Sequence, residues 1–270
     1  DPAAAIGRSY DAVPYDPGAH AHLSLARVRG AATALGLTSA WASAPDVLDI
    51  GCGAGAQLLL AAGQGAGRLV GIDASADACA QARARCGELG ERWRILHGDA
   101  AALELSALGR FDVIYLLGTL YIMPPAERGR LLAGLGAYLK PGGVVVMNYY
   151  AGINGLLRAR LSRLLHDSND PARPVPYQVA LARANLQAIV DAVPATGTTR
   201  DLVRATLASV AATDDTVLFH EALGAVNETL LTAEIEAVLA PHGLVFLNYM
   251  PPAPVVLGVA SRAAACAVDA

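Results

Sequence analysis

The feature that most constrains the fold is a regular alternation of short apolar runs and amphipathic stretches between Pro45 and Val146. Short apolar runs bounded by turn residues are typical of strands, and longer stretches with helical periodicity are typical of helices. The expected strands are Asp46–Ile50, Arg68–Ile72, Trp93–Leu96, Phe111–Leu117 and Gly143–Met147, and the expected helices lie near Gly55–Ala62, Ala76–Leu89 and Pro125–Leu139. Strands joined by helices predict an α/β protein whose parallel sheet is covered on both faces.

The segments on either side of this alternation have different patterns. A loop and a helix are expected in 16–37, and residues 152–210 are mostly helical in pattern. A further helix is expected at Thr232–Leu239, followed by strands at Gly243–Asn248 and Pro254–Ala260. We therefore expect four parts: an N-terminal lid and helix (1–44), an α/β core (45–151), a helical insertion (152–231) and the end of the core (232–270).

Composition narrows the classes of function. A net charge of -4 argues against a nucleic-acid binder, which normally carries a basic face. The four cysteines lack metal-ligand spacing, and the pair His20 and His22 has no third ligand in sequence, so no metal is expected. Neither a signal-peptide pattern nor an apolar run of transmembrane length is visible. These observations predict a cytoplasmic protein without a nucleic-acid or membrane partner.

The stretch VLDIGCGAG (47–55) ends an expected strand with glycines in alternate positions. Such a turn lets backbone N–H groups and a helix N-terminus approach a ligand closely. The spacing Gly51-x-Gly53-x-x-Ala56 fits the dinucleotide fingerprint, which tolerates alanine in the third place. A tight structural turn gives the same spacing, so the turn alone indicates only a nucleotide-like ligand.

Three acids follow or end neighbouring strands and narrow the ligand further. Asp49 lies in a strand that should be buried, and an unpaired carboxylate there is costly unless it meets a donor such as an ammonium group. Asp73 ends the second strand, where an acid can accept both ribose hydroxyls. Asp99 follows the third strand, in position to accept from an adenine amino group. Together they predict S-adenosylmethionine, whereas Asp49 would repel the pyrophosphate of a nicotinamide dehydrogenase.

Five motifs now occur in order: VLDIGCGAG, VGID (70–73), HGDAA (97–101), FDVIYLLGTLYIMP (111–124) and LKPGG (139–143). This series resembles the class I S-adenosylmethionine-dependent methyltransferases. The resemblance implies a Rossmann-like, mostly parallel seven-stranded sheet that ends in a hairpin (242–250 and 254–260), with a helical cap inserted after the fifth strand. It also implies cofactor contacts from Tyr10, Tyr15, Gly51, Gly53, Ala74, Ala100 and Leu117, in addition to Asp49, Asp73 and Asp99.

Flanking motifs resemble the methyltransferases that carry a methyltransferase regulatory domain. The motifs are SYDAVPY (9–15), MNYYAG (147–152), FHEALGAVNETLL (219–231) and PHGLVFL (241–247). Some members of that group are bacterial protein-lysine methyltransferases, and those members tend to be longer than this chain. We therefore expect methyl transfer to a nitrogen or oxygen of a small molecule or peptide, with S-adenosylhomocysteine as product. Protein-lysine N-methylation is the alternative, and a non-catalytic binding module is a remote one.

The candidate catalytic residues follow from what methyl transfer needs, which is in-line positioning, exclusion of water and a deprotonated acceptor. Aromatic faces attract a sulfonium or a methylated ammonium by about 0.5–2 kcal/mol. Tyr121 and Tyr150 follow the fourth and fifth strands and are expected at the methyl site, although packing would also explain them. His220 and Glu221 are expected to deprotonate and hold an amine acceptor, and a core or capping role fits them equally well.

Overall fold

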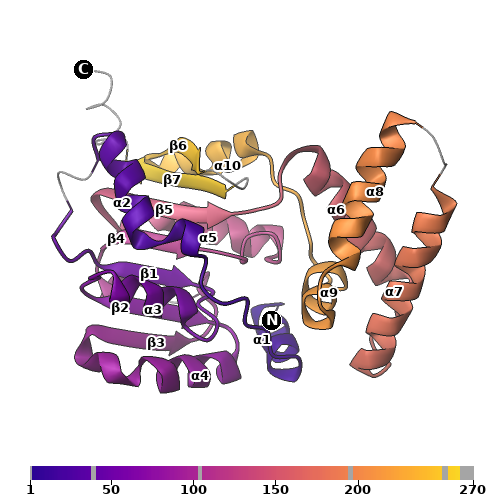
Figure 1. Cartoon of the computed structure of the whole chain (residues 1–270). Coiled ribbons are helices and arrows are strands. Elements are labelled where there is room, and N and C mark those ends of the chain that lie inside the picture. The colour runs from indigo at the N-terminus through magenta and orange to yellow at the C-terminus, as the bar shows by residue number, and fades with distance from the viewer. Residues whose placement is uncertain (1, 38–40, 103–104, 194–196, 251–254, 262–270) are drawn as a thin grey trace. The chain divides into compact units, whose positions relative to one another are not determined.

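The computed structural model describes residues 2–37, 41–102, 105–193, 197–250 and 255–261 (Figure 1). The chain divides into two compact units. The core unit comprises Asp1–Tyr149 and Thr232–Ala270, and the helical unit comprises Tyr150–Leu231. Each unit has its own set of buried apolar side chains.

The core unit is built on one sheet with the strand order β3-β2-β1-β4-β5-β7-β6. The strands are β1 Val47–Ile50, β2 Leu69–Asp73, β3 Trp93–His97, β4 Phe111–Leu116, β5 Leu139–Asn148, β6 Leu244–Met250 and β7 Val255–Ser261. Strands β1 to β5 run parallel, and β7 pairs antiparallel with both β5 and β6. The α/β class and the parallel core that the sequence predicted are confirmed. Since β1 lies at the centre of the parallel strands, its turn is flanked by the ends of β2 and β4.

Helices pack on both faces of this sheet (Figure 1). The helices of the core unit are α1 Pro2–Ala12, α2 Leu25–Ala34, α3 Ala56–Gly63, α4 Ala76–Cys86, α5 Pro125–Tyr138 and α10 Thr232–Leu239, with short 3-10 turns at η1 Ala21–Leu23, η3 Gly87–Arg92, η4 Leu105–Leu108 and η5 Ala240–His242. Helix α1 contacts α4 beside the strand ends instead of covering a face of the sheet. Local chemistry explains where two of these helices, α4 and α5, begin. Ser75 caps α4 by accepting from the Ala78 N–H, and Pro125 begins α5 where a missing N–H needs no partner.

The N-terminal segment differs from the expectation. Residues 9–15 were predicted to be a lid that precedes the first helix, but α1 already extends through Ala12. The start of α1 is rich in alanine, the strongest helix former. Apolar periodicity alone does not reveal a helix of this composition. The helix stops before Val13 and Pro14, because a proline disfavours helical geometry in the residue that precedes it.

The fifth strand also begins earlier than predicted, at Leu139 rather than Gly143. Leu139 pairs with Phe111, and the next pair along the ladder joins Val144 to Val113. Between these two pairs the chain advances five residues along β5 but two along β4. The turn expected in LKPGG is therefore an irregularity inside the strand.

The helical unit contains α6 Gly152–Asp167, α7 Val175–Ala192, α8 Thr198–Ala211 and α9 Asp215–Ala222. Their buried apolar side chains form one cluster: Leu165, Val179, Ala182, Leu186, Leu207, Val210, Leu218, Ala222 and Leu223. Asp214 caps α9 by accepting from the Val217 N–H at 2.8 Å. The helical pattern predicted for 152–210 is thereby confirmed.

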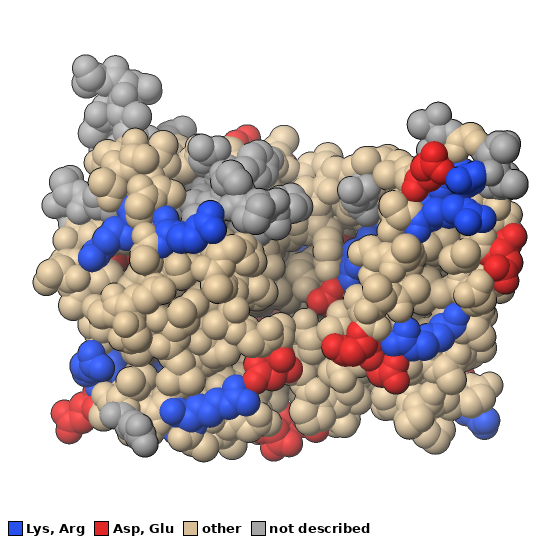
Figure 2. Space-filling model, in the orientation of Figure 1, with Lys and Arg blue, Asp and Glu red and all other residues tan. Residues whose placement is uncertain are grey.

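Charge on the molecule is sparse and mixed. Figure 2 shows Lys and Arg side chains interspersed with Asp and Glu on the face drawn, and most of that face carries neither. Within the described ranges, every helix is too short or too polar to span a bilayer.

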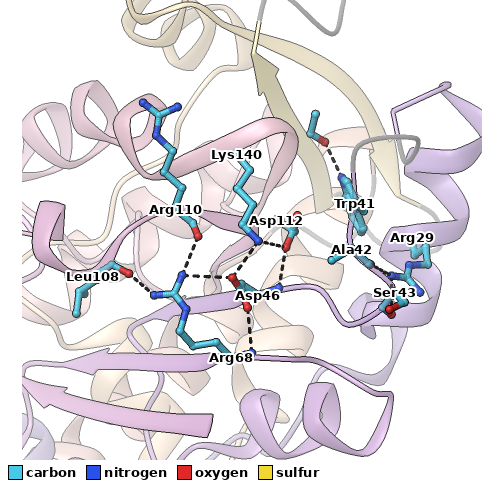
Figure 3. A network of polar contacts seen from close by, with 11 residues as sticks. Arg29, Trp41, Ala42, Ser43, Asp46, Arg68, Leu108, Arg110, Asp112 and Lys140 are labelled. Carbon is cyan, nitrogen blue, oxygen red and sulfur yellow. Dashed lines mark hydrogen bonds and ion pairs between the residues drawn. The ribbon is translucent and has the colours of Figure 1, made fainter.

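The amino ends of the parallel strands are tied together by one polar network (Figure 3). Lys140, the only lysine in the sequence, places its Nζ 2.9 Å from Asp46 and 2.8 Å from Asp112. Asp46 also accepts from the Arg68 backbone N–H at 3.0 Å, and the Arg68 guanidinium lies over the Phe111 ring. The network therefore links β1, β2, β4 and β5 at the edge opposite their carboxyl ends.

Within this network, the buried carboxylate of Asp112 makes the loss of a neighbouring positive charge costly to stability. The Asp112 side chain is only 1% exposed, and its Oδ1 is buried without a hydrogen bond among the described residues. Its Oδ2 accepts from the Asp46 N–H at 2.7 Å and pairs with Lys140, the cation that faces this buried carboxylate. Hydrogen bonds to Asp112 and Asp46 raise the pKa of Lys140 although burial opposes them. Lys140 therefore remains charged across the physiological range and is a structural residue.

We predict that Lys140→Met lowers the free energy of unfolding by about 2–3 kcal/mol, because it leaves a buried carboxylate without its partner. Urea denaturation measures the change. The matched control is Arg163→Met, which removes an exposed ion pair to Asp167 and should cost less than about 0.5 kcal/mol. Equal costs for the two variants would refute the structural role of Lys140.

Candidate active site

The glycine turn after β1 forms the centre of the candidate site. Gly51 and Gly53 have φ of +78° and +51°, a region that side chains rarely adopt. A Cβ on Gly51 would also lie 2.3 Å from the Thr119 Oγ1, so that position has no room for a side chain. A Cβ on Gly53 would meet no atom within 4 Å. The backbone of the turn is therefore open on the Gly53 side, where a ligand can approach.

Asp73 joins this turn to the end of β2. Its carboxylate accepts from the Gly53 N–H and the Ser75 N–H, each at 2.8 Å. Burial raises the pKa of Asp73, while these backbone hydrogen bonds act in the opposite direction. The structure thus brings together Gly53 and Asp73, two of the predicted cofactor residues from different strands.

Asp49 is the most unusual group of the site. It is 2% exposed and lies in β1 opposite Gly71 and Tyr115. Burial, followed by the charge of Asp73, raises the pKa of Asp49 to about 7. Among the described residues, no hydrogen-bond donor reaches its carboxylate. A buried acid with no protein partner is costly in its charged form, and a ligand cation would relieve that cost. These residues therefore fit the ammonium group of an amino-acid moiety.

Residues after β4 and β5 that sequence reasoning missed hold the other side of the turn. The Thr119 Oγ1 lies 3.1 Å from the carbonyl of Ile50, which ends β1. The Asn148 Oδ1 accepts from the Gly118 N–H at 2.6 Å, which links the ends of β4 and β5. A polar residue at the end of a buried strand (Asn148) or three residues after one (Thr119) was the available signal. Leu117 and Tyr121, which were predicted, lie buried in the same loop.

The loop after β3 completes the row of strand ends. Asp99 accepts from the Ala101 N–H at 2.9 Å and so folds the loop that contains Ala100. The Gly98 N–H donates to the Asp73 carbonyl at 2.8 Å, so the loops after β2 and β3 are adjacent. The three predicted acids are therefore positioned by neighbouring strand ends of one sheet.

The N-terminal segment contributes the two tyrosines that were expected in the lid. The rings of Tyr10 and Tyr15 lie 6.2 Å apart, and Tyr10 belongs to α1. The His97 ring lies 3.1 Å from the carbonyl of Ala74, another predicted cofactor residue. Both α1 and His97 thus border the turn between β2 and α4.

A second polar cluster lies within the helical unit. The Tyr150 hydroxyl donates to the Glu221 Oε2 at 2.6 Å, and Arg158 donates to the same oxygen at 2.5 Å. The Arg158 guanidinium also lies 4.5 Å above the Tyr150 ring. Tyr150 and Glu221 were predicted, whereas Arg158 was not, since nothing in its sequence position distinguishes it from other helix arginines. His220, also predicted, is 5% exposed and packs its ring against Phe219.

Comparison with known proteins relates the central part of the core unit to one protein family. Residues 47–143 match the family of methyltransferase domains. The carboxy-S-adenosyl-L-methionine synthase of Chromohalobacter salexigens is 36% identical over 107 residues, which is 38% of either chain. The solved structure of PKMT2 from Rickettsia typhi has a TM-score of 0.74, at 20% identity, and covers 87% of this chain and 45% of that one. Its complex with AdoHcy has a TM-score of 0.75 and covers 88% and 46%.

The family match spans the glycine turn and all three strand-end acids. Residues 47–143 are therefore similar to methyltransferase domains, in agreement with the predicted class I S-adenosylmethionine-dependent methyltransferase. The cofactor of that class is S-adenosylmethionine, in agreement with the prediction from the acids. The fold similarity to PKMT2 covers 87% of this chain, which is more than the core unit alone contains. The shared fold therefore extends into the helical unit. The matched stretches are less than half the length of these relatives.

We predict that Asp49→Asn stabilises the ligand-free protein at pH 8 and leaves its stability at pH 4 unchanged. The folded-state pKa lies above that of an unfolded chain, so the folded state retains a proton that the unfolded state loses between about pH 4 and 7. The wild-type protein therefore loses stability as the pH rises through that window. The neutral amide avoids this loss, which is worth about 4 kcal/mol for a shift of this size.

Urea denaturation at both pH values measures this effect. Asp46→Asn is the matched control. Burial is the largest single effect on Asp46 and raises its pKa, but the hydrogen bonds from Lys140 and from the Arg68 N–H, together with the charges of these two residues, lower the pKa of Asp46 overall. That variant should lose stability at pH 8. If Asp49→Asn is also destabilising at pH 8, Asp49 has a protein partner and the ligand argument is wrong.

Proposed function

We propose that this protein is an S-adenosylmethionine-dependent methyltransferase that methylates a nitrogen or oxygen of a small molecule or peptide. The observation that carries the proposal is the buried Asp49 carboxylate, which has an elevated pKa and lies beside an open glycine turn. A methyltransferase domain uses such a turn for the methionine end of its cofactor, and a cationic ammonium suits the acid. A pyrophosphate would instead add a negative charge beside Asp49 and Asp73.

The residues of the core unit have distinct tasks in this proposal. Asp49 binds the ammonium group, Asp73 accepts from the ribose hydroxyls with its remaining lone pairs, and Asp99 accepts from the adenine amino group. The backbone around Gly51 and Gly53 lies against the methionine end. The bound cofactor supplies an electrophilic sulfonium methyl group. The protein contributes orientation and exclusion of water, which are the main requirements of the reaction.

The polar cluster of the helical unit is proposed to act on the acceptor. Tyr150 follows the end of β5 by two residues, so its backbone lies within about 7 Å of a strand end that borders the cofactor loops. Glu221 and Arg158 hold the Tyr150 hydroxyl from one side and its ring from above. Glu221 is already balanced by Arg158, so we assign it to positioning Tyr150 and to polarising an acceptor. His220 remains the candidate base within the helical unit, and Tyr121 remains a candidate aromatic contact within the core unit.

Protein-lysine N-methylation is the second candidate for the reaction. The observation that favours it is that the fold likeness to PKMT2 extends beyond the core unit into the helical unit. The two candidates differ in acceptor size, so incubation with labelled S-adenosylmethionine distinguishes them. Label transferred to lysine-containing proteins but not to short peptides or small amines would favour the second candidate.

We predict that S-adenosylmethionine and S-adenosylhomocysteine bind the protein and that NAD does not. Asp73→Ala removes charge-assisted hydrogen bonds to ribose, each worth about 1.5–3 kcal/mol, so affinity should fall at least tenfold. Isothermal titration calorimetry measures both. Asp77→Ala is the control, since that exposed residue of α4 makes only a backbone contact to Asp11. Binding of NAD without S-adenosylmethionine would overturn the proposed function.

We predict that Glu221→Gln and His220→Ala each reduce turnover by about 100-fold, the scale of general acid–base catalysis, with cofactor affinity unchanged. Product S-adenosylhomocysteine is measured at saturating cofactor once an acceptor is found. Glu236→Gln, an exposed position in α10, serves as the matched control. Parental turnover in both variants would show that the cluster is structural and would leave the acceptor chemistry to Tyr121.

A further inference from the structure

Helix α1 contacts the cofactor-binding loop through one carboxylate that the proposed function has not used. The Asp11 Oδ1 accepts from the Ser75 hydroxyl at 2.5 Å and from the Asp77 N–H at 3.1 Å. Ser75 is 2% exposed, and its N–H donates to the Asp73 Oδ1 at 2.8 Å. A continuous chain of hydrogen bonds therefore runs from α1 through Ser75 to the acid that is proposed to bind ribose.

The backbones of α1 and this loop are also in direct contact. A Cβ on Gly7 would lie 2.1 Å from the carbonyl oxygen of Ala74, so only glycine allows the helix to approach this closely. Beyond α1, Asp16 forms an ion pair with Arg85 of α4 at 2.6 Å. The segment is thus attached to the β2–α4 region at three places, which are Gly7, Asp11 and Asp16.

Electrostatics alone does not explain an acid at position 11. The charge of Asp11 contributes to raising the pKa of Asp73, so the two carboxylates repel each other. The hydrogen bond from Ser75 is the largest cause that lowers the pKa of Asp11 itself. The favourable effect of Asp11 is therefore its geometry as an acceptor, which fixes the loop, whereas its charge opposes a second acid nearby.

We propose that Asp11 is a positioning residue that holds Asp73 in place for the ribose hydroxyls by fixing Ser75. The inference rests on the proposed cofactor site and adds the N-terminal helix to it. Because Asp11 accepts both hydrogen bonds through one oxygen, an asparagine amide oxygen can replace it. An alanine cannot, and the loop then loses its attachment to α1.

The test measures dissociation constants for S-adenosylhomocysteine in the full chain. Asp11→Ala should weaken binding by about tenfold, whereas Asp11→Asn should stay within about threefold of the parental value. Gly7→Ala should weaken binding in the same direction, because the methyl group separates α1 from Ala74. Gly30→Ala is the matched control, since Gly30 lies in α2 and a Cβ there would meet no atom within 4 Å.

Two further readouts separate positioning from a general effect on folding. Asp11→Ala should lose the preference for S-adenosylhomocysteine over its 2′-deoxyribose analogue, because Asp73 is the residue proposed to accept from that hydroxyl. Asp11→Ala should also add less than about twofold to the loss in Asp73→Asn, since residues that act through one another are not additive. Equal weakening by Asp11→Ala and Asp11→Asn, an unchanged hydroxyl preference or full additivity would each overturn the inference. Failure of the parental protein to bind S-adenosylhomocysteine would instead refute the proposed function.

Discussion

The arrangement of the site depends on one buried carboxylate, Asp49, in the central parallel strand. Parallel strands end at one edge of the sheet, so the turns after β1, β2, β3 and β4 meet there. The field at this edge is unfavourable for a further negative charge, because burial raises the pKa of both Asp49 and Asp73 and the charge of Asp73 raises that of Asp49 further. A neutral or anionic ligand gains nothing from such a field, whereas a cationic amino-acid group does. Burial of Asp49 therefore lowers stability at neutral pH, a cost that the proposed ammonium group of the cofactor would offset.

Much of the architecture was predictable because local signals and the global fold agree. The apolar runs at 47–50 and 111–116 are fully buried, as parallel strands require, and turns with glycine or an acid end β1, β2 and β3. The strand-end acids were predictable for the same reason, since a strand assignment fixes where the next residues lie. The ends of helices and strands were harder to predict where two sequence patterns conflict. In α1, for example, helix-forming alanines precede residues that are typical of a loop. In β5 the sequence KPGG suggested a turn that the structure forms within the strand.

The residues that sequence reasoning missed act through partners that are distant in the chain. Asp11 meets Ser75 across 64 positions, Lys140 meets Asp46 across 94, and Arg158 meets Glu221 across 63. Neither periodicity nor local spacing contains information about such pairs, because each depends on how separate elements pack. Lys140 illustrates this limit. No local pattern in the sequence distinguishes it, whereas the structure gives it two carboxylates to neutralise.

If the ammonium group of the cofactor binds beside Asp49, this carboxyl group should lose its proton on binding. Calorimetric titration with S-adenosylmethionine at pH 6.5, in buffers of different ionisation enthalpy, counts the protons exchanged on binding. Since Asp49 titrates near 7 in the free protein, the account predicts release of roughly half a proton or more per site, and none in Asp49→Asn. Binding heats that do not depend on the buffer in the parental protein would contradict the account.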